Sequence, residues 1–163
     1  MFKINFKKIL FNFTIISLIF FIDRTSKNYI LKIAEKESLV DIYINSYLNF
    51  YLIWNKGIAF GLFSFDQNLI YNLITLIIVV ISFVIIILII KTNGIERYLF
   101  TLVFGGAISN LYDRIYYKAV PDFIDFHIAE YHWFVFNVAD IFITLGILSI
   151  ILKEVLKKKN EKN

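Results

Sequence analysis

The apolar positions of this chain fall into four runs, which predict four helices. The first run, residues 9–22, is short, but it can continue as a helix past Asp23. A helix needs about 20 mainly apolar residues to cross a bilayer, and the later runs approach or reach that length. The predicted helices cover about residues 9–30, 67–90, 98–115 and 136–153. We therefore expect a mostly α-helical membrane protein with four transmembrane helices, in which residues 1–163 form a single integral membrane domain.

The segment between the first two runs has a different pattern. Within residues 40–64, aromatic and β-branched residues gather with partial alternation in Ile42–Ile44 and Tyr47–Trp54. Turn-forming residues follow each stretch, at Asn45-Ser46 and at Asn55-Lys56-Gly57. Such stretches bounded by turns are typical of short strands. We therefore expect a small extracytoplasmic β-sheet in this segment.

Composition narrows the possible chemistry. The chain is 59% hydrophobic and has a mean hydropathy of +0.70, which a soluble domain of 163 residues rarely reaches. It contains no cysteine, so disulfides, zinc-thiolate sites and a cysteine nucleophile are excluded. The two histidines, His127 and His132, fall in one predicted loop. We expect neither a metal site nor a cofactor.

Charge predicts the topology. Basic residues gather near both ends of the chain and between the second and third apolar runs, at Lys3, Lys7, Lys8, Lys91, Arg97, Lys153, Lys157, Lys158, Lys159 and Lys162. Segment 23–66 and loop 117–133 carry balanced or acidic charge. The positive-inside rule then places both termini in the cytoplasm, and these two segments outside. The net charge of +4 is interpreted as this topology signal, and no nucleic-acid partner is expected.

Ionisable residues interrupt the last two apolar runs. Asp113 and Arg114 lie near the end of the third run, and Asp140 lies near the start of the fourth. Such groups are costly at membrane depth and by default indicate a functional site. Gly106, Asn110 and Asp113 have the spacing i, i+4, i+7, so they share one helical face. The glycine lets a neighbouring helix approach closely at that face.

A third carboxylate lies in the predicted loop between these helices. Only 17 residues separate Asp122 from Asp140, so the loop can bring the two carboxyl groups together. Two carboxylates that share one proton titrate as a unit. One can then act as a general base on water while the other polarises a carbonyl group. Asn137 lies one turn before Asp140, and Ala139 leaves space beside them.

Two further features belong to the outer side of the predicted membrane protein. Asp23 and Lys27 are four residues apart, a favourable acidic-then-basic spacing, and we expect them at the outer surface bracing the first helix and the sheet. In the turn after the strands, Gly57 permits close backbone approach and Asn55 can bind a peptide group. Taken alone, this turn is better interpreted as an ordinary structural turn.

Five ordered blocks of sequence resemble the lipoprotein signal peptidases, the type II signal peptidases of bacteria. The blocks are Asp23-x-x-Ser26-Lys27, Asn55-x-Gly57-x-Ala59-Phe60, Gly105-Gly106-Ala107-x-x-Asn110-x-x-Asp113-Arg114, Asp122-Phe123 and Phe136-Asn137-x-Ala139-Asp140. Each block is weakly specific, but all five in this order in a four-helix protein are highly specific. One departure is Pro121, where the family usually has an aliphatic residue.

The resemblance implies an intramembrane aspartyl endopeptidase that needs no cofactor. Such enzymes remove the signal peptide of a diacylglyceryl-modified prolipoprotein, cleaving just before the lipidated cysteine. The family's catalytic pair falls on Asp122 and Asp140. Its substrate-binding or supporting positions fall on Asp23, Lys27, Asn55, Gly57, Gly106, Asn110, Asp113, Arg114, Asn137 and Ala139. Among these, Arg114 is expected to neutralise Asp113.

The same resemblance implies the partners and the location. The partners would be the lipid-modified substrate and membrane lipid, and the chain itself is expected to be a monomer. It would be a multi-pass protein of the bacterial cytoplasmic (inner) membrane, with its active site near the outer face. Two alternatives remain at this point, a small transporter or channel whose buried carboxylates carry ions, and a structural subunit whose aspartates only fix helix contacts.

Overall fold

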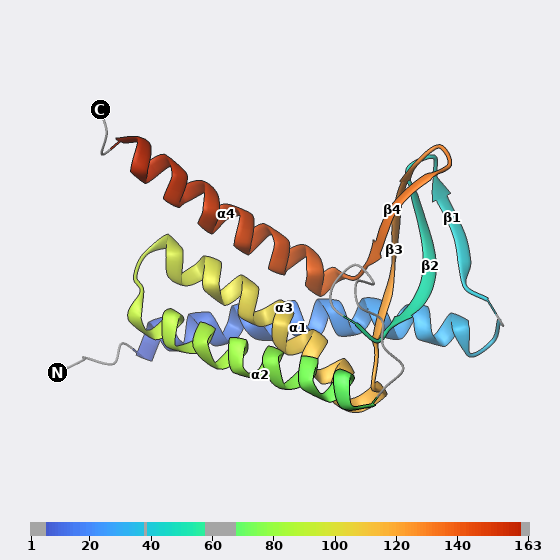
Figure 1. Cartoon of the computed structure of the whole chain (residues 1–163), viewed down its shortest axis with the longest axis horizontal. Coiled ribbons are helices and arrows are strands. Elements are labelled where there is room, and N and C mark those ends of the chain that lie inside the picture. Colours follow the sequence, from blue (N-terminus) through green and yellow to red (C-terminus); the bar gives the residue numbers. More distant parts are fainter. Residues whose placement is uncertain (1–5, 38, 58–67, 161–163) are drawn as a thin grey trace.

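The computed structural model describes residues 6–37, 39–57 and 68–160. Four helices lie along one another and a sheet stands at one end of them (Figure 1). The helices are α1 (Phe6–Ala34), α2 (Asn68–Lys91), α3 (Ile95–Tyr117) and α4 (Val138–Asn160). The start of α1, the α2–α3 connection and the end of α4 all lie at the end remote from the sheet (Figure 1). The basic segments of the sequence therefore share one end of the molecule.

Helix α3 is the centre of the bundle, since it packs against α1, α2 and α4. Two glycines bring it close to α4. A Cβ on Gly106 would lie 2.5 Å from the carbonyl oxygen of Ala139, and one on Gly146 would lie 2.5 Å from Cγ2 of Val103. Small residues at such crossings allow two backbones to approach closely. The predicted role of Gly106 in helix packing is therefore confirmed, and Ala139 lies opposite it.

The sheet has four antiparallel strands in the order β1-β2-β3-β4. They are β1 (Asp41–Asn45), β2 (Leu48–Asn55), β3 (Val120–Ile128) and β4 (Tyr131–Phe136). Ile30 at the end of α1 packs with Val40 and Phe123 in a buried cluster. This cluster holds the sheet against the helices, and β3 joins the sheet directly to the end of α3.

The predicted β segment is confirmed for residues 41–55, with its turn at Ser46-Tyr47. Residues 58–64 of that segment, which include Ala59 and Phe60 of the second sequence block, lie outside the described residues. The prediction of a loop over 117–133 is wrong, because β3 and β4 form there. The presence of Pro121 and two aspartates hides the strand pattern of β3, which pairing with both β2 and β4 stabilises nevertheless.

The helix boundaries also differ from the prediction, most of all in α1 and α4. Helix α1 continues to Ala34 instead of ending near residue 30, because its last turn packs on the sheet. Helix α4 begins at Val138 and ends at Asn160, instead of covering 136–153. Phe136 belongs to β4, so that the chain passes from strand to helix at Asn137. This change of direction places Asn137 at the N-terminus of α4.

The outer surface of the bundle is strongly apolar. Side chains such as Phe13, Phe21, Leu76, Phe83 and Leu148 are more than half exposed. Apolar surface of this extent indicates contact with a membrane or a partner. Of the described helices, only α2, over Tyr71–Lys91, is long and apolar enough to be recognised as a membrane span. The other three helices carry the ionisable residues discussed below.

The C-terminus of α3 generates a first prediction. Lys118 ends the helix in the left-handed conformation, with φ 58° and ψ 21°, and its side chain is exposed. This conformation costs an L-residue about 1–2 kcal/mol, whereas glycine adopts it freely. Lys118→Gly should therefore raise the melting temperature in detergent, by about 2–4 °C per kcal/mol for a chain of this size.

The matched control for this prediction is Lys32→Gly, at an exposed position inside the last turn of α1. Glycine there should lower the melting temperature, because it costs about 1 kcal/mol in a helix. Equal losses in the two variants would show that Lys118 is not strained.

Candidate active site

Asp122 lies near the start of β3 and is 2% exposed. Its two carboxylate oxygens accept hydrogen bonds from two side-chain amides. Asn55 Nδ2 at the end of β2 donates to Oδ2 at 2.8 Å, and Asn137 Nδ2 donates to Oδ1 at 2.6 Å. Because β2 and β3 are neighbours in the sheet, Asn55 is presented directly to Asp122. The carboxyl group is thus held by neutral donors on rigid elements.

Asp140 lies in the first turn of α4 and is 5% exposed. Its Oδ2 accepts a hydrogen bond from the backbone N–H of Asn137, and its own N–H donates to Asn137 Oδ1, both at 3.1 Å. This reciprocal pair is a capping box, in which Asp140 takes the place of the usual Glu or Gln. Asn110 Nδ2 on α3 donates to Asp140 Oδ1 at 2.8 Å. The start of α4 therefore fixes the orientation of this carboxyl group.

Asn137 joins the two carboxyl groups, since it donates to Asp122 from its side chain and to Asp140 from its backbone. The structure thus brings Asp122 and Asp140 together, as the sequence predicted. Burial raises the pKa of Asp122 to about 7, and the neighbouring Asp140 carboxylate adds to this rise. Among the described residues, no ion pair includes either aspartate. Asp122 therefore retains a proton more readily than an isolated carboxylate does.

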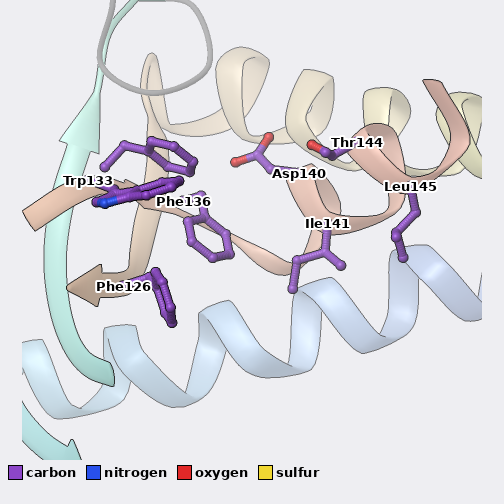
Figure 2. A pocket seen from close by; sticks show the side chains of 8 residues that line it. Phe126, Trp133, Phe136, Asp140, Ile141, Thr144 and Leu145 are labelled. Atoms are coloured by element: carbon purple, nitrogen blue, oxygen red, sulfur yellow. The ribbon is translucent and has the colours of Figure 1, made fainter. Parts of the chain in front are cut away.

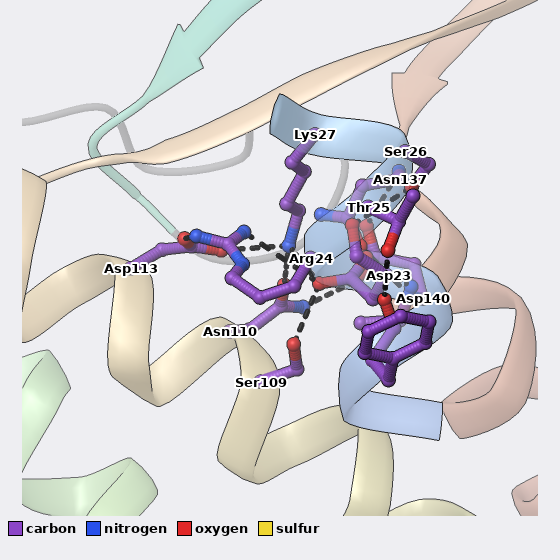
Figure 3. Close-up of polar contacts among 12 residues, drawn as sticks. Asp23, Arg24, Thr25, Ser26, Lys27, Ser109, Asn110, Asp113, Asn137 and Asp140 are labelled. Carbon is purple, nitrogen blue, oxygen red and sulfur yellow. Dashed lines mark hydrogen bonds and ion pairs between the residues drawn. The ribbon is translucent and has the colours of Figure 1, made fainter. Parts of the chain in front are cut away.

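A second cluster of charges lies beside this pair, between α1 and α3 (Figure 3). Lys27 Nζ lies 2.7 Å from Asp23 Oδ2 and 2.6 Å from Asp113 Oδ2, and all three side chains are completely buried. Arg24 Nη1 lies 2.6 Å from Asp113 Oδ1. Two cations therefore balance two carboxylates here, and buried charges arranged in this way neutralise one another.

The charge cluster also positions the aspartate pair. Asn110 accepts a hydrogen bond from Lys27 Nζ at 2.8 Å while its amide nitrogen donates to Asp140 (Figure 3). Asp23 Oδ1 accepts a hydrogen bond from the backbone N–H of Ala139 at 2.9 Å, and its Oδ2 accepts one from Ser109 Oγ at 2.6 Å. Through these contacts α1 and α3 hold the first turn of α4 in place.

Arg114 and the turn after β2 contact each other beside the aspartate pair. The guanidinium group of Arg114 donates a hydrogen bond to the carbonyl oxygen of Gly57. Asn55 Oδ1 accepts one from the N–H of Gly57 at 2.8 Å. Tyr71 on α2 supports Arg114 by donating to its carbonyl oxygen at 2.9 Å and by placing its ring 5.6 Å from the guanidinium carbon. The turn is therefore fastened to both α3 and the sheet.

Two cavities reach the aspartates. One, of about 220 Å³, is lined by both Asp122 and Asp140, together with Asn110, Arg114 and apolar residues of α2, α3 and α4. The other, of about 310 Å³, is lined by Asp140 and otherwise mainly by aromatic and aliphatic side chains, among them Trp133 and Phe136 (Figure 2). Only the first contacts both carboxyl groups, so it is the better candidate for a reaction site, although the second is larger.

Two predictions about the charged residues differ from the structure. Asp23 and Lys27 do form the expected pair, but they are completely buried instead of lying at the outer surface. Arg114 was expected to neutralise Asp113, and the prediction is wrong because Lys27 and Arg24 do so. The helical face of Arg114 turns away from Asp113, since adjacent residues on a helix do not face each other.

Three residues of the site were not predicted, namely Arg24, Ser109 and Tyr71. Arg24 follows Asp23 within an apolar helix, and the cost of a charge at that position is the signal that could have identified it. Ser109 lies one residue before Asn110 on α3, beside Gly105 and Gly106. Tyr71 gives no signal, because its role depends on the packing of α2 against α3.

Comparison with known proteins shows which family the sequence matches. The sequence matches the family model of Signal peptidase (SPase) II over residues 15–156. The chain belongs to the signal peptidase II family. It is 58% identical to the lipoprotein signal peptidase of Pelagibacter ubique over 164 residues, which covers 99% of each chain. It is 40% identical to the lipoprotein signal peptidase of Aquifex aeolicus over 147 residues, covering 89% of this chain and 86% of the relative.

The fold of this family member also matches a solved structure, described as a bacterial membrane enzyme. The two share 27% sequence identity with a TM-score of 0.71, and the match covers 93% of this chain and 91% of that chain. The resemblance identified from the sequence is therefore confirmed. Membership of the signal peptidase II family makes the chain a protease, and together with the solved neighbour it indicates a membrane protein.

The close contact at Gly106 generates a second prediction. In Gly106→Ala the new methyl group would lie 2.5 Å from the backbone carbonyl oxygen of Ala139, so α4 must move away from α3. We expect a lower melting temperature and a loss of protease activity greater than the loss of stability explains, because Asp140 moves with α4. Melting curves and cleavage rates at a temperature where the variant is folded would measure the two effects.

The matched control is Gly105→Ala, in which the nearest atom would be Cδ1 of Ile19 at 2.8 Å. That atom is the end of a flexible side chain, so activity should be largely retained. Equal activity in the two variants would show that the α3–α4 contact does not position Asp140.

Proposed function

We propose that this chain is an intramembrane aspartyl endopeptidase that removes the signal peptide from diacylglyceryl-modified prolipoproteins, cleaving before the lipidated cysteine. The observation that carries the proposal is the environment of Asp122 and Asp140. Both carboxyl groups are buried, both accept hydrogen bonds from neutral amides, and both line one cavity. The transporter and structural-subunit alternatives lose their support, since the chain belongs to a protease family.

The proposed reaction uses the two carboxyl groups as an acid and a base. One carboxylate takes a proton from a water molecule, and the hydroxide equivalent attacks the carbonyl carbon of the scissile peptide. The other carboxyl group donates its proton to the carbonyl oxygen, which gives a neutral tetrahedral intermediate. When the C–N bond breaks, the carboxyl group that took the proton from water gives it to the leaving nitrogen. The other carboxylate takes back a hydroxyl proton of the intermediate as the carbonyl group re-forms, which restores the starting state of the pair. No metal or nucleophilic side chain takes part in these steps.

The surrounding residues have supporting roles in this proposal. Asn55, Asn110 and Asn137 orient the carboxyl groups through the hydrogen bonds described above. Arg114 lines the cavity, and its Nη1 has no hydrogen-bond partner among the described residues. A buried guanidinium nitrogen without a partner is costly, so we assign it to a backbone carbonyl group of the bound signal peptide.

The position of the site suits a substrate that is anchored by lipid. In the proposed topology all four helices cross the inner membrane as a monomer, and both termini lie in the cytoplasm near the basic segments. The aspartates then lie at the outer side, where the half-exposed Trp54 and Trp133 of the sheet mark the interface. The apolar cavity beside Asp140 offers surface for an acyl chain of the substrate (Figure 2).

Substitution of the two aspartates tests the proposed mechanism. Asp122→Asn and Asp140→Asn should each lower the rate of prolipoprotein cleavage at least about 100-fold, because positioned acid–base groups contribute about 10²–10⁴-fold. The measurement is cleavage of a diacylglyceryl-modified prolipoprotein by each purified variant in detergent. Asp41→Asn, at an exposed position on β1, is the matched control and should cleave like the wild type. Normal cleavage by a folded Asp122→Asn or Asp140→Asn variant would refute the acid–base assignment.

The raised pKa of Asp122 generates a separate prediction about stability. Its pKa of about 7 in the folded protein exceeds the ordinary value of 3.8, so the folded state binds the proton more tightly than the unfolded state. This contribution to stability is complete below about pH 4 and is lost as the pH rises through about 7. Asparagine mimics the neutral acid at every pH. Relative to the wild type, Asp122→Asn should therefore gain melting temperature between pH 5 and pH 8.

Melting curves of the two proteins across this pH range provide the measurement. A difference that stays constant from pH 5 to pH 8 would mean that Asp122 is already ionised throughout, which contradicts a shared proton in the aspartate pair.

A further inference from the structure

Asp125, His127 and His132 form a second cluster of chemically active side chains, at the hairpin of β3 and β4. His127 lies directly opposite His132 in the register of the two strands, and Asp125 lies two residues before His127 on β3. Side chains two residues apart on a strand point to the same face, as do directly opposite residues of two paired strands. The hairpin therefore gathers all three side chains on one face of the sheet, although the sequence had indicated only a loop.

The distances within this cluster are short. His132 Nδ1 lies 2.8 Å from Asp125 Oδ2, and His127 Nδ1 lies 3.7 Å from the same oxygen. The two imidazole rings stack with their centroids 5.0 Å apart. One ligand atom from each of the three residues can be chosen so that all lie within 4.8 Å of one another. One carboxylate and two imidazole groups, all able to bind metal ions, thus converge on one point.

The cluster contains polar atoms whose hydrogen-bonding capacity is unused. Asp125 is 4% exposed and His127 is 8% exposed. Among the described residues, neither Asp125 Oδ1 nor His127 Nδ1 has a hydrogen-bond partner. A buried polar group without a partner costs about 1–3 kcal/mol. Since these two atoms lie within the cluster, a ligand placed there would remove this cost.

We propose that Asp125, His127 and His132 bind a divalent transition-metal ion, with Zn²⁺ as the best fit. Imidazole nitrogen and carboxylate oxygen both bind Zn²⁺ at about 2.0–2.2 Å, which in a tetrahedral site places neighbouring ligand atoms roughly 3.3 Å apart. The separations of 2.8 Å and 3.7 Å from Asp125 Oδ2 lie on either side of that value, and the three ligand atoms lie within 4.8 Å of one another, so side-chain rotation is needed to close the set around an ion. Water would complete the coordination.

The site is accessible to an ion from solution. The side chain of His132 is 55% exposed, which leaves an entry path from the tip of the hairpin. The hairpin projects away from the helices, on the side remote from the bundle (Figure 1). The proposed metal site is therefore separate from the Asp122–Asp140 pair. It does not depend on the proposed protease mechanism.

Metal binding would tie β3 to β4, with a consequence for the neighbouring cavity. Phe126 and Trp133 alternate along these strands with the proposed ligands and line the apolar cavity beside Asp140 (Figure 2). Fixing the register of His127 against His132 also fixes these two aromatic side chains. The ion would thus act as a structural clamp on one wall of the cavity, without contact with the reacting groups.

Metal titration of the full-length chain in detergent tests the proposal. After treatment with a chelator and its removal, the protein should bind one Zn²⁺ per chain in calorimetry, and its melting temperature should rise with added Zn²⁺ as expected for a ligand of the folded state. Co²⁺ used as a probe should give visible absorption bands of a low-symmetry site with nitrogen and oxygen ligands. Absence of saturable binding by both ions would overturn the proposal.

Substitution of the proposed ligands tests whether these residues bind the ion. His132→Gln, at a half-exposed position, should fold normally yet lose at least tenfold in Zn²⁺ affinity together with the Zn²⁺-dependent rise in melting temperature. Asp125→Asn should have the same effect. Asp41→Asn, at an exposed position on the same sheet, serves as the control and should bind like the wild type. Unchanged Zn²⁺ affinity in His132→Gln would place the ion elsewhere and refute the assignment.

Discussion

The buried ammonium group of Lys27 is the interaction on which the rest of the site depends. It contacts Asp23 on its own helix and Asp113 and Asn110 on α3, and it has no exposure to solvent. Asp23 in turn binds the first turn of α4 through the N–H of Ala139. Removing one partner of a buried ion pair costs about 3–5 kcal/mol, because it leaves an uncompensated charge. Three helices are therefore bound to one set of charges.

The buried carboxylates of this protein have two different kinds of partner, cations and neutral amides. Asp23 and Asp113 lie against Lys27 and Arg24, so their charges are compensated and their role is to hold helices together. Asp122 and Asp140 receive hydrogen bonds from asparagine amides instead. A neutral amide orients a carboxyl group without supplying the positive charge that would keep it ionised. Two carboxyl groups that line one cavity, with no ion-pair partner among the described residues, suit the acid–base chemistry proposed above.

Prediction from the sequence succeeded where the geometry of one helix, or the free-energy cost of placing a charge in an apolar run, determined the outcome. Asn110 and Asp113 share a face of α3 because 3.6 residues form a turn, and a charge within an apolar run needs a partner wherever it lies. Prediction failed for β3 and β4, because the strand character of β3 depends on pairing with β2 and β4, and that of β4 depends on pairing with β3. It also failed for Arg114, because the sequence shows that a cation is adjacent to Asp113 but not that α1 supplies two better placed ones.

The sequence by itself determined the helices and their apolar surfaces, because helical periodicity and the cost of buried charge are local properties. Its five ordered blocks also indicated the family and singled out Asp122 and Asp140. Only the tertiary structure decided which donor meets which carboxylate. Asn55, Asn110 and Asn137 come from a strand, a helix and a helix N-terminus, and their meeting depends on strand register and helix packing. The tertiary structure also decided that Asp125, His127 and His132 converge, because strand register sets which residues lie opposite each other in a hairpin. The residue types alone do not reveal that register.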